Sequence, residues 1–131
     1  MSTESIYKAM ASYLKSSSIG SSMKFYPSHA PQTASDPYCV LNLISNDTDI
    51  HHGGSFDTGN AIFQFDFFSK TLATLDNRVE SLKNAFVGQS INLTSGVTIS
   101  GVNSQNEFDD YDDKSDTYIR SIDLVFKYIF N

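Results

Sequence analysis

The sequence predicts an α+β fold, with a mainly antiparallel sheet of about four strands and two helices packed on one face. Two segments place apolar residues at helical spacing, whereas the segments between and after them alternate apolar and polar residues as strands do. Such alternation predicts one covered sheet face and one face that is wet or covered by a partner. With 131 residues and no visible repeat, the chain is expected to form a single domain over residues 1–131.

The composition is that of a globular protein, because 40% of the residues are hydrophobic and 18% are charged. The single cysteine excludes an internal disulfide, and the N-terminus lacks the pattern of a secretory signal. No run approaches the roughly 18 apolar residues of a membrane span, so we expect a soluble protein without a membrane partner. Outside residues 107–116 the chain holds eight bases and nine acids, which is no general footprint for nucleic acid.

The first predicted element is an amphipathic helix in residues 2–18, STESIYKAMASYLKSSS. Its apolar positions follow the spacing of one buried face: Ile6, Met10 and Tyr13, with Tyr7 and Leu14 alongside. Residues 16–37 then form a long connection rich in Ser and Pro. A loop of this length is either functional or ordered only on binding, and both interpretations stay open.

Two strands are expected next. Residues 37–45, PYCVLNLIS, alternate so that Cys39 lies on an apolar strand face, where it is expected to be a small buried hydrophobe. Residues 46–60 contain glycine breakers and predict a loop. Residues 61–69, AIFQFDFFS, are the clearest strand, and the side chains expected on its apolar face are Ala61, Phe63, Phe65 and Phe67.

The second helix is expected in residues 71–88, where the apolar stripe is Leu72, Leu75, Val79, Leu82 and Phe86. Ser69 or Thr71 can cap its start, and Gly88 suits a left-handed C-terminal stop. Residues 89–108 are expected to hold one or two weaker strands, with Ile91 and Leu93, then Val97 and Ile99. The final residues, 116–131, predict one long antiparallel strand.

Residues 107–116 are strongly acidic, with six carboxylates against Lys114. An EF-hand starting at Asp110 would have Lys114 at its fifth position and Ser115 at the glycine position, so that motif is excluded. We interpret the segment as a solvated loop between the last two strands. A looser calcium or small-ligand site, or a surface kept negative for a partner, remains open.

No other segment predicts chemistry, so no catalytic, cofactor or metal site is expected and the chain is not expected to be an enzyme. His51 and His52 are adjacent on a glycine loop, where nothing fixes their directions toward a metal. Asp66 and Asp123 fall on the polar faces of their strands, where solvent is expected to cover them. Nucleophile-elbow, dinucleotide and phosphate-loop motifs are absent from the sequence.

The order of these segments resembles the tail terminator and tail completion proteins of long-tailed bacteriophages. The resemblance covers nearly the whole chain in order, although its residues are structural and include no chemical signature. The segments that carry it are Phe25-Tyr26-Pro27 with Ala30-Pro31, Pro37-Tyr38 opening YCVL, Phe63 to Ser69 passing into Thr71-Leu72, Leu75-Asp76, Val79-Glu80 and Leu82, and a final strand from Tyr118 to Tyr128. The loop at residues 46–60 and the density of acids depart from the pattern.

The resemblance implies a single tail-terminator-like domain that forms a homohexameric ring in the virion neck, after assembly in the host cytoplasm. Its expected partners are further copies of itself, the tail tube protein, the head connector or stopper, and passing DNA in transient, non-specific contact. A head-completion or connector protein of the adjacent ring is the closest alternative. The candidate residues facing the lumen or a partner are Asp109, Asp110, Asp112, Asp113 and Asp116, and the candidate docking-loop residues are Phe25, Tyr26, His51 and His52.

Overall fold

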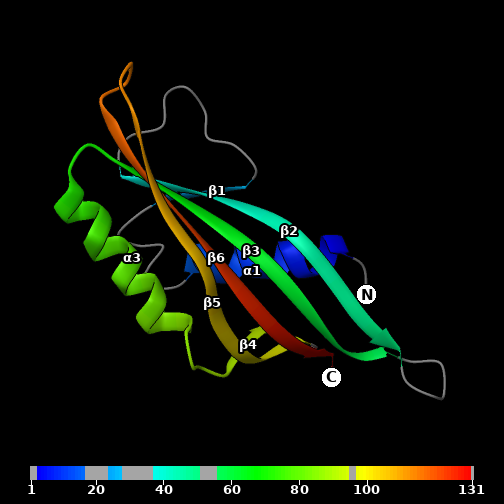
Figure 1. The fold of residues 1–131 in the computed structure, drawn as a ribbon. Helices are drawn as coiled ribbons and strands as arrows, with labels where there is room; N and C mark the ends of the chain where they lie inside the picture. Colours follow the sequence, from blue (N-terminus) through cyan, green and yellow to red (C-terminus); the bar gives the residue numbers. More distant parts are fainter. Residues whose placement is uncertain (1–2, 17–23, 28–36, 51–55, 95–96, 131) are drawn as a thin grey trace.

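The computed structural model describes residues 3–16, 24–27, 37–50, 56–94 and 97–130, which form two helices and one six-stranded sheet (Figure 1). The order of the strands across the sheet is β1-β2-β3-β6-β5-β4. The elements in chain order are α1 (Thr3–Ser16), β1 (Lys24–Pro27), β2 (Tyr38–Ile50), β3 (Phe56–Ser69), α3 (Leu72–Phe86), β4 (Ile91–Thr94), β5 (Val97–Asp112) and β6 (Thr117–Phe130).

The predicted fold class is confirmed, but the number of strands is six rather than about four. Neighbouring strands are antiparallel throughout, except that β1 runs parallel to β2. The additional strand is β1, which the sequence did not reveal, whereas β4 and β5 correspond to the weaker strands expected after the second helix. β1 has only four residues, and so short a segment carries too few alternations to be recognised in a sequence.

The expected connection at residues 16–37 is therefore interrupted by β1. Its register aligns Lys24 with Tyr38 and Pro27 with Leu41. Phe25 is only 7% exposed and belongs to the core, so this docking-loop candidate lies on a strand and is covered by the protein itself. Tyr26 lies on the same strand and is half-buried.

The expected loop at residues 46–60 is also wrong over most of its length. β2 continues to Ile50 and β3 begins at Phe56, with pairs that include Asn46 opposite Ala61. Register shifts between Leu43 and Ser45 and near Ile50 break the simple alternation, so the sequence pattern of this part is not that of a regular strand. The two histidine candidates, His51 and His52, lie outside the described residues.

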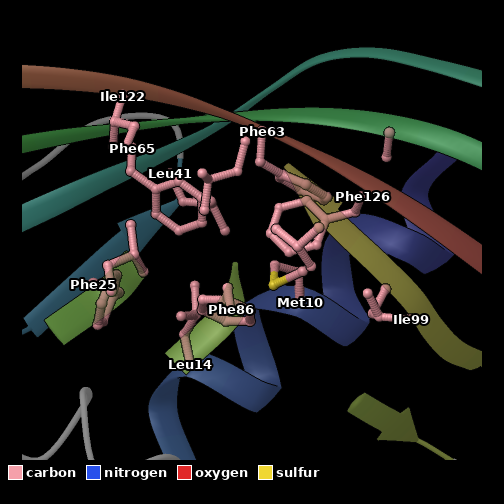
Figure 2. Packing of buried hydrophobic residues seen from close by; sticks show 14 of the residues in the cluster. Met10, Leu14, Phe25, Leu41, Phe63, Phe65, Phe86, Ile99, Ile122 and Phe126 are labelled. Atoms are coloured by element: carbon pink, nitrogen blue, oxygen red, sulfur yellow. The ribbon is translucent and has the colours of Figure 1, made fainter. Parts of the chain in front are cut away.

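Both helices pack against the same face of the sheet, as predicted. Alternate side chains of β3 and β6 point to this face and meet apolar side chains from α1 and α3 in one cluster (Figure 2). The ring of Phe126 lies 5.5 Å from that of Phe63 and 5.4 Å from that of Phe86, both edge to face. Tyr13 of α1 lies 5.7 Å from Phe86 of α3, so the two helices also contact each other.

The predicted helix signals of α3 are confirmed. The hydroxyl of Thr71 accepts a hydrogen bond from the backbone amide of Thr74 at 3.4 Å, which caps the helix start. Gly88 has a φ of 77°, the left-handed conformation that a glycine adopts without strain after a helix. Cys39 is fully buried as expected, and this burial raises the pKa of its thiol.

We predict that Phe126→Ala lowers the free energy of unfolding by about 3–5 kcal/mol, because the truncated ring leaves a cavity between β6 and α3. The measurement is urea unfolding followed by circular dichroism. Ile44→Ala is the control, since Ile44 is 53% exposed and its truncation should change stability by no more than about 0.5 kcal/mol. Equal losses in the two variants would contradict this description of the core.

Candidate functional site

The acidic segment forms a hairpin rather than a loop. We call residues 103–120 the acidic hairpin: they comprise the last part of β5, a turn at residues 113–116 and the start of β6. All side chains from Asn103 to Asp116 are exposed. The expectation of a solvated loop therefore holds for the turn alone, since residues 107–112 belong to a strand. Figure 1 shows this hairpin at one end of the sheet.

The strand alternation sends the acidic side chains to two opposite faces. Glu107 reaches Lys83 of α3 at 2.6 Å and Asp109 reaches Arg120, so these two carboxylates lie on the helix side. By alternation Asp110 and Asp112 lie on the helix-free face, which is the sheet face opposite α1 and α3. The carboxylates thus do not converge on one point. Within the described ranges no group of three or more His, Cys, Asp or Glu side chains could hold a metal ion.

Arg120 connects the hairpin to α3. Its Nε donates to Asp109 Oδ1 at 2.6 Å and its Nη1 donates to Asp76 Oδ1 of α3 at 2.5 Å. The Arg120 side chain is only 13% exposed, so its guanidinium group is largely shielded from solvent. The hydrogen bond from Arg120 lowers the pKa of Asp109, and the hydrogen bond to Asp109 raises the pKa of Arg120.

The turn is held by its own side chains. Asp112 accepts hydrogen bonds from the Ser115 hydroxyl at 2.7 Å and from the Lys114 backbone amide at 3.1 Å, and the bond from Ser115 is the main cause of its lowered pKa. The Tyr111 hydroxyl donates to Asp116, which raises the pKa of Tyr111 to about 12. Asp116 itself has a φ of 53°, a conformation that closes the turn. Four of the sequence-predicted acids, Asp109, Asp110, Asp112 and Asp116, therefore have hydrogen-bond partners within the hairpin.

Arg120 is the residue of this site that the sequence analysis did not single out. Its position carried a signal, because Tyr118, Arg120 and Ile122 fall on the same strand face, and Ile122 is in the core. A base on the covered face of a strand requires an acidic partner. The acids 11 residues away across a hairpin supply it.

Two more carboxylates lie on the helix-free face, where the expectation of full solvation is corrected. Asp66 is half-buried and accepts a hydrogen bond from the Ser121 hydroxyl at 2.5 Å. Burial raises the pKa of Asp66, and the nearby charge of Asp123 raises it further, whereas the bond from Ser121 lowers it. Asp123 is also half-buried, and its Oδ1 is covered without a hydrogen-bond partner in the described part of the chain.

On the helix side, a groove of about 340 Å³ separates the start of α3 from the hairpin. Its walls come from α3, β5 and β6, and the residues are Leu72, Leu75, Asp109, Asp110, Tyr111, Tyr118 and Ile119. Leu72 and Tyr111 are each 42% exposed there. An apolar floor with an acidic rim suits a segment that combines apolar and basic side chains.

No described helix is long and apolar enough to cross a membrane. No protein-family model matches the chain, and no curated protein matches its sequence. Its fold is nevertheless found in solved structures. A chain of the virion of a native gene transfer agent particle superposes with a TM-score of 0.68 and 14% identity, over 95% of this chain and 94% of that one. A second solved chain superposes with a TM-score of 0.56 and 11% identity, over 100% and 96%. At such identities the likeness shows the fold.

We predict that Asp109→Asn lowers the stability by up to about 1 kcal/mol at pH 7, because it removes one carboxylate from Arg120. The folded-state pKa of Asp109 lies below its ordinary value of 3.8. Its stabilising contribution is therefore complete above pH 3.8 and is lost as the pH falls through the folded-state value. Urea unfolding at pH 7 and at a series of pH values below 3.8 should show a difference from the wild type that shrinks as the pH falls.

Asp110→Asn is the matched control, since Asp110 is the next residue on the same strand and points to the opposite face. It should leave the stability nearly unchanged at both pH values. A pH-independent loss in Asp109→Asn, or the same loss in both variants, would show that the ion pair with Arg120 does not stabilise the hairpin.

Proposed function

We propose that this chain is a structural virion protein, a tail terminator that forms a hexameric ring, caps the tail tube and joins it to the head connector. The observation that carries the proposal is the likeness, over nearly the full length of both chains, to a chain of a gene transfer agent virion. The order of segments that resembles tail terminators supports the same role independently of that comparison. A ring of this kind needs shape and surface charge, and it performs no chemistry.

The charges of the helix-free face suit the wall of a DNA channel. Asp66, Asp110, Asp112 and Asp123 lie on this face, and the bases that the strand alternation adds there are Lys24 and Lys127. Each lysine or arginine that contacts a phosphate adds salt-dependent affinity, so a wall that conducts DNA must have few bases. In the proposed ring this face lines the lumen, and the exposed turn acids Asp113 and Asp116 lie at its rim.

The groove on the helix side suits the second expected contact. Its floor is apolar, and the carboxylate of Asp109 lies at its rim. In the proposed neck, the groove takes a segment of the tail tube protein or the head connector that carries basic and apolar side chains. The acidic hairpin thus has one face for the lumen and one for a partner protein.

The position of the chain in the particle tests the role. An epitope tag detected by gold labelling in electron micrographs should mark the junction between tube and head, and should also mark tail tubes that lack heads. A head-completion protein would instead mark heads that lack tails, which would favour the alternative role. Labelling along the whole tube, or on the capsid, would contradict both.

The lumen hypothesis predicts that Asp113→Lys slows DNA release from assembled particles and makes the rate depend on salt, because the new lysine binds passing phosphates. The control is Glu80→Lys, which makes the same charge change at an exposed position of α3. Release kinetics can be followed with a dye that binds free DNA. Unchanged release in both variants, with assembly intact, would place the turn away from the DNA path.

A further inference from the structure

Two edges of the sheet have backbone groups that face no strand among the described residues. Within the described residues, β1 pairs only with β2, and β5 pairs with β4 only up to Ile99. Residues 103–112 of β5 therefore have β6 on one side and no described strand on the other. The Tyr111 amide donates to the side chain of Asp110 at 2.8 Å. Such edges are templates for pairing with another chain.

Residues of the two edges are aligned with each other across the sheet. One row of paired residues runs across it from Lys24 to Tyr38, Phe68, Ile119 and Asp110. Directly paired residues place their side chains on the same face. Lys24 and Asp110 are both exposed, so a base and an acid lie at opposite ends of one row. Figure 1 shows β1 and the hairpin at the same end of the sheet.

A second row of paired residues, two residues further along, also joins the two edges. It runs from Tyr26 to Val40, Asp66, Ser121 and Phe108. Phe108 is 54% exposed, so a large apolar side chain faces solvent between the neighbouring acidic residues. Its row ends at the opposite edge in another aromatic ring, that of Tyr26.

The strand directions are compatible with direct pairing of the two edges. β1 runs parallel to β2, and each following neighbour up to β5 reverses the direction, so β5 runs antiparallel to β1. When two copies stand side by side in the same orientation, β5 of one copy can therefore form an antiparallel ladder with β1 of the next. Antiparallel neighbours of this kind exchange backbone hydrogen bonds at about 5 Å between Cα atoms.

The charges of the two edges are complementary as well. The exposed lysines Lys8, Lys15 and Lys24 lie on α1 and β1, which pack against each other. The other edge holds the acidic hairpin, with six acids against one base in residues 107–116. Opposite charges steer two surfaces together and fix their register.

We propose that β5 of one copy pairs edge to edge with β1 of a second copy, so that Asp110 meets Lys24 and Phe108 meets Tyr26 of the neighbouring copy. Each copy then uses two different edges, which is a heterologous contact that continues from copy to copy. The closure of this series into a ring rests on the proposed function, whereas the pairing rests on the edges themselves.

A cysteine trap tests the contact. The variant Tyr26→Cys/Phe108→Cys, oxidised at high protein concentration, should give a ladder of disulfide-linked oligomers on a non-reducing gel, because the paired positions fall within disulfide distance. The wild type controls for Cys39, which is buried. The off-register control Tyr26→Cys/Asn103→Cys places the second thiol about 15 Å further along the strand and should give no ladder. No ladder in the first variant, or equal ladders in both, would overturn the proposal.

A charge swap tests the same contact without cross-linking. Lys24→Glu and Asp110→Lys should each weaken self-association about tenfold in sedimentation equilibrium, and the double variant should recover most of the loss. A double variant no stronger than the single ones would overturn the pairing. Gold labelling at the neck without a ladder would leave the proposed function standing and refute the pairing, whereas a ladder with labelling elsewhere would do the reverse.

Discussion

The antiparallel ladder between β3 and β6 is the constraint on which the rest of the structure depends. Twelve consecutive pairs join these strands without a register shift, from Thr58 with Ile129 to Ser69 with Tyr118. Because side chains alternate, this register sends Phe63, Phe65 and Phe126 to the helices together. A slip of either strand by one residue would expose that strand's apolar side chains and bury their polar neighbours, which is far more costly than any surface contact could offset.

The same register positions the acidic hairpin. Toward its N-terminal end, β6 keeps the same alternation of side chains. This alternation places Arg120 on the helix side, beside Asp76. Across the sheet, β5 is the next strand after β6, and its Asp109 lies opposite Arg120. The middle of the sheet is held by buried apolar contacts, whereas its hairpin end is held by ion pairs and turn hydrogen bonds that are individually weak. We therefore expect the hairpin to open locally at lower free energy than the core, a property common in segments that bind partners.

What the sequence predicts well is what the core dictates. The stripe and caps of α3 and the Phe-rich strand β3 agree with the structure. In each of these elements the apolar side chains recur at the period of a helix or of a strand. β1 was missed because it has only four residues, although its Phe25 belongs to the core. The extensions of β2, β3 and β5 are strands for a different reason: they pair with a neighbouring strand while their own side chains are largely polar. Strand formation depends on such neighbours more than on intrinsic preference, so Glu107 to Asp112 gave the pattern of a loop. The acids were visible in the sequence, but their division between two faces requires the register.

The charges on the two edges also decide which symmetry the proposed association can have. Two β5 edges brought together would place carboxylates opposite carboxylates, and two β1 edges would place Lys24 near its own copy, both of which are unfavourable. Unlike edges are thus favoured over like ones, which selects a head-to-tail series over a twofold dimer. In such a series Asp110 is neutralised by Lys24 at each junction. Asp112 and Asp113, on the helix-free face and in the turn, keep their charge for the lumen, because the partners of Asp112 are a hydroxyl and a backbone amide rather than a base. One acidic hairpin can therefore serve both contacts, because its alternation and register give each carboxylate a different neighbour.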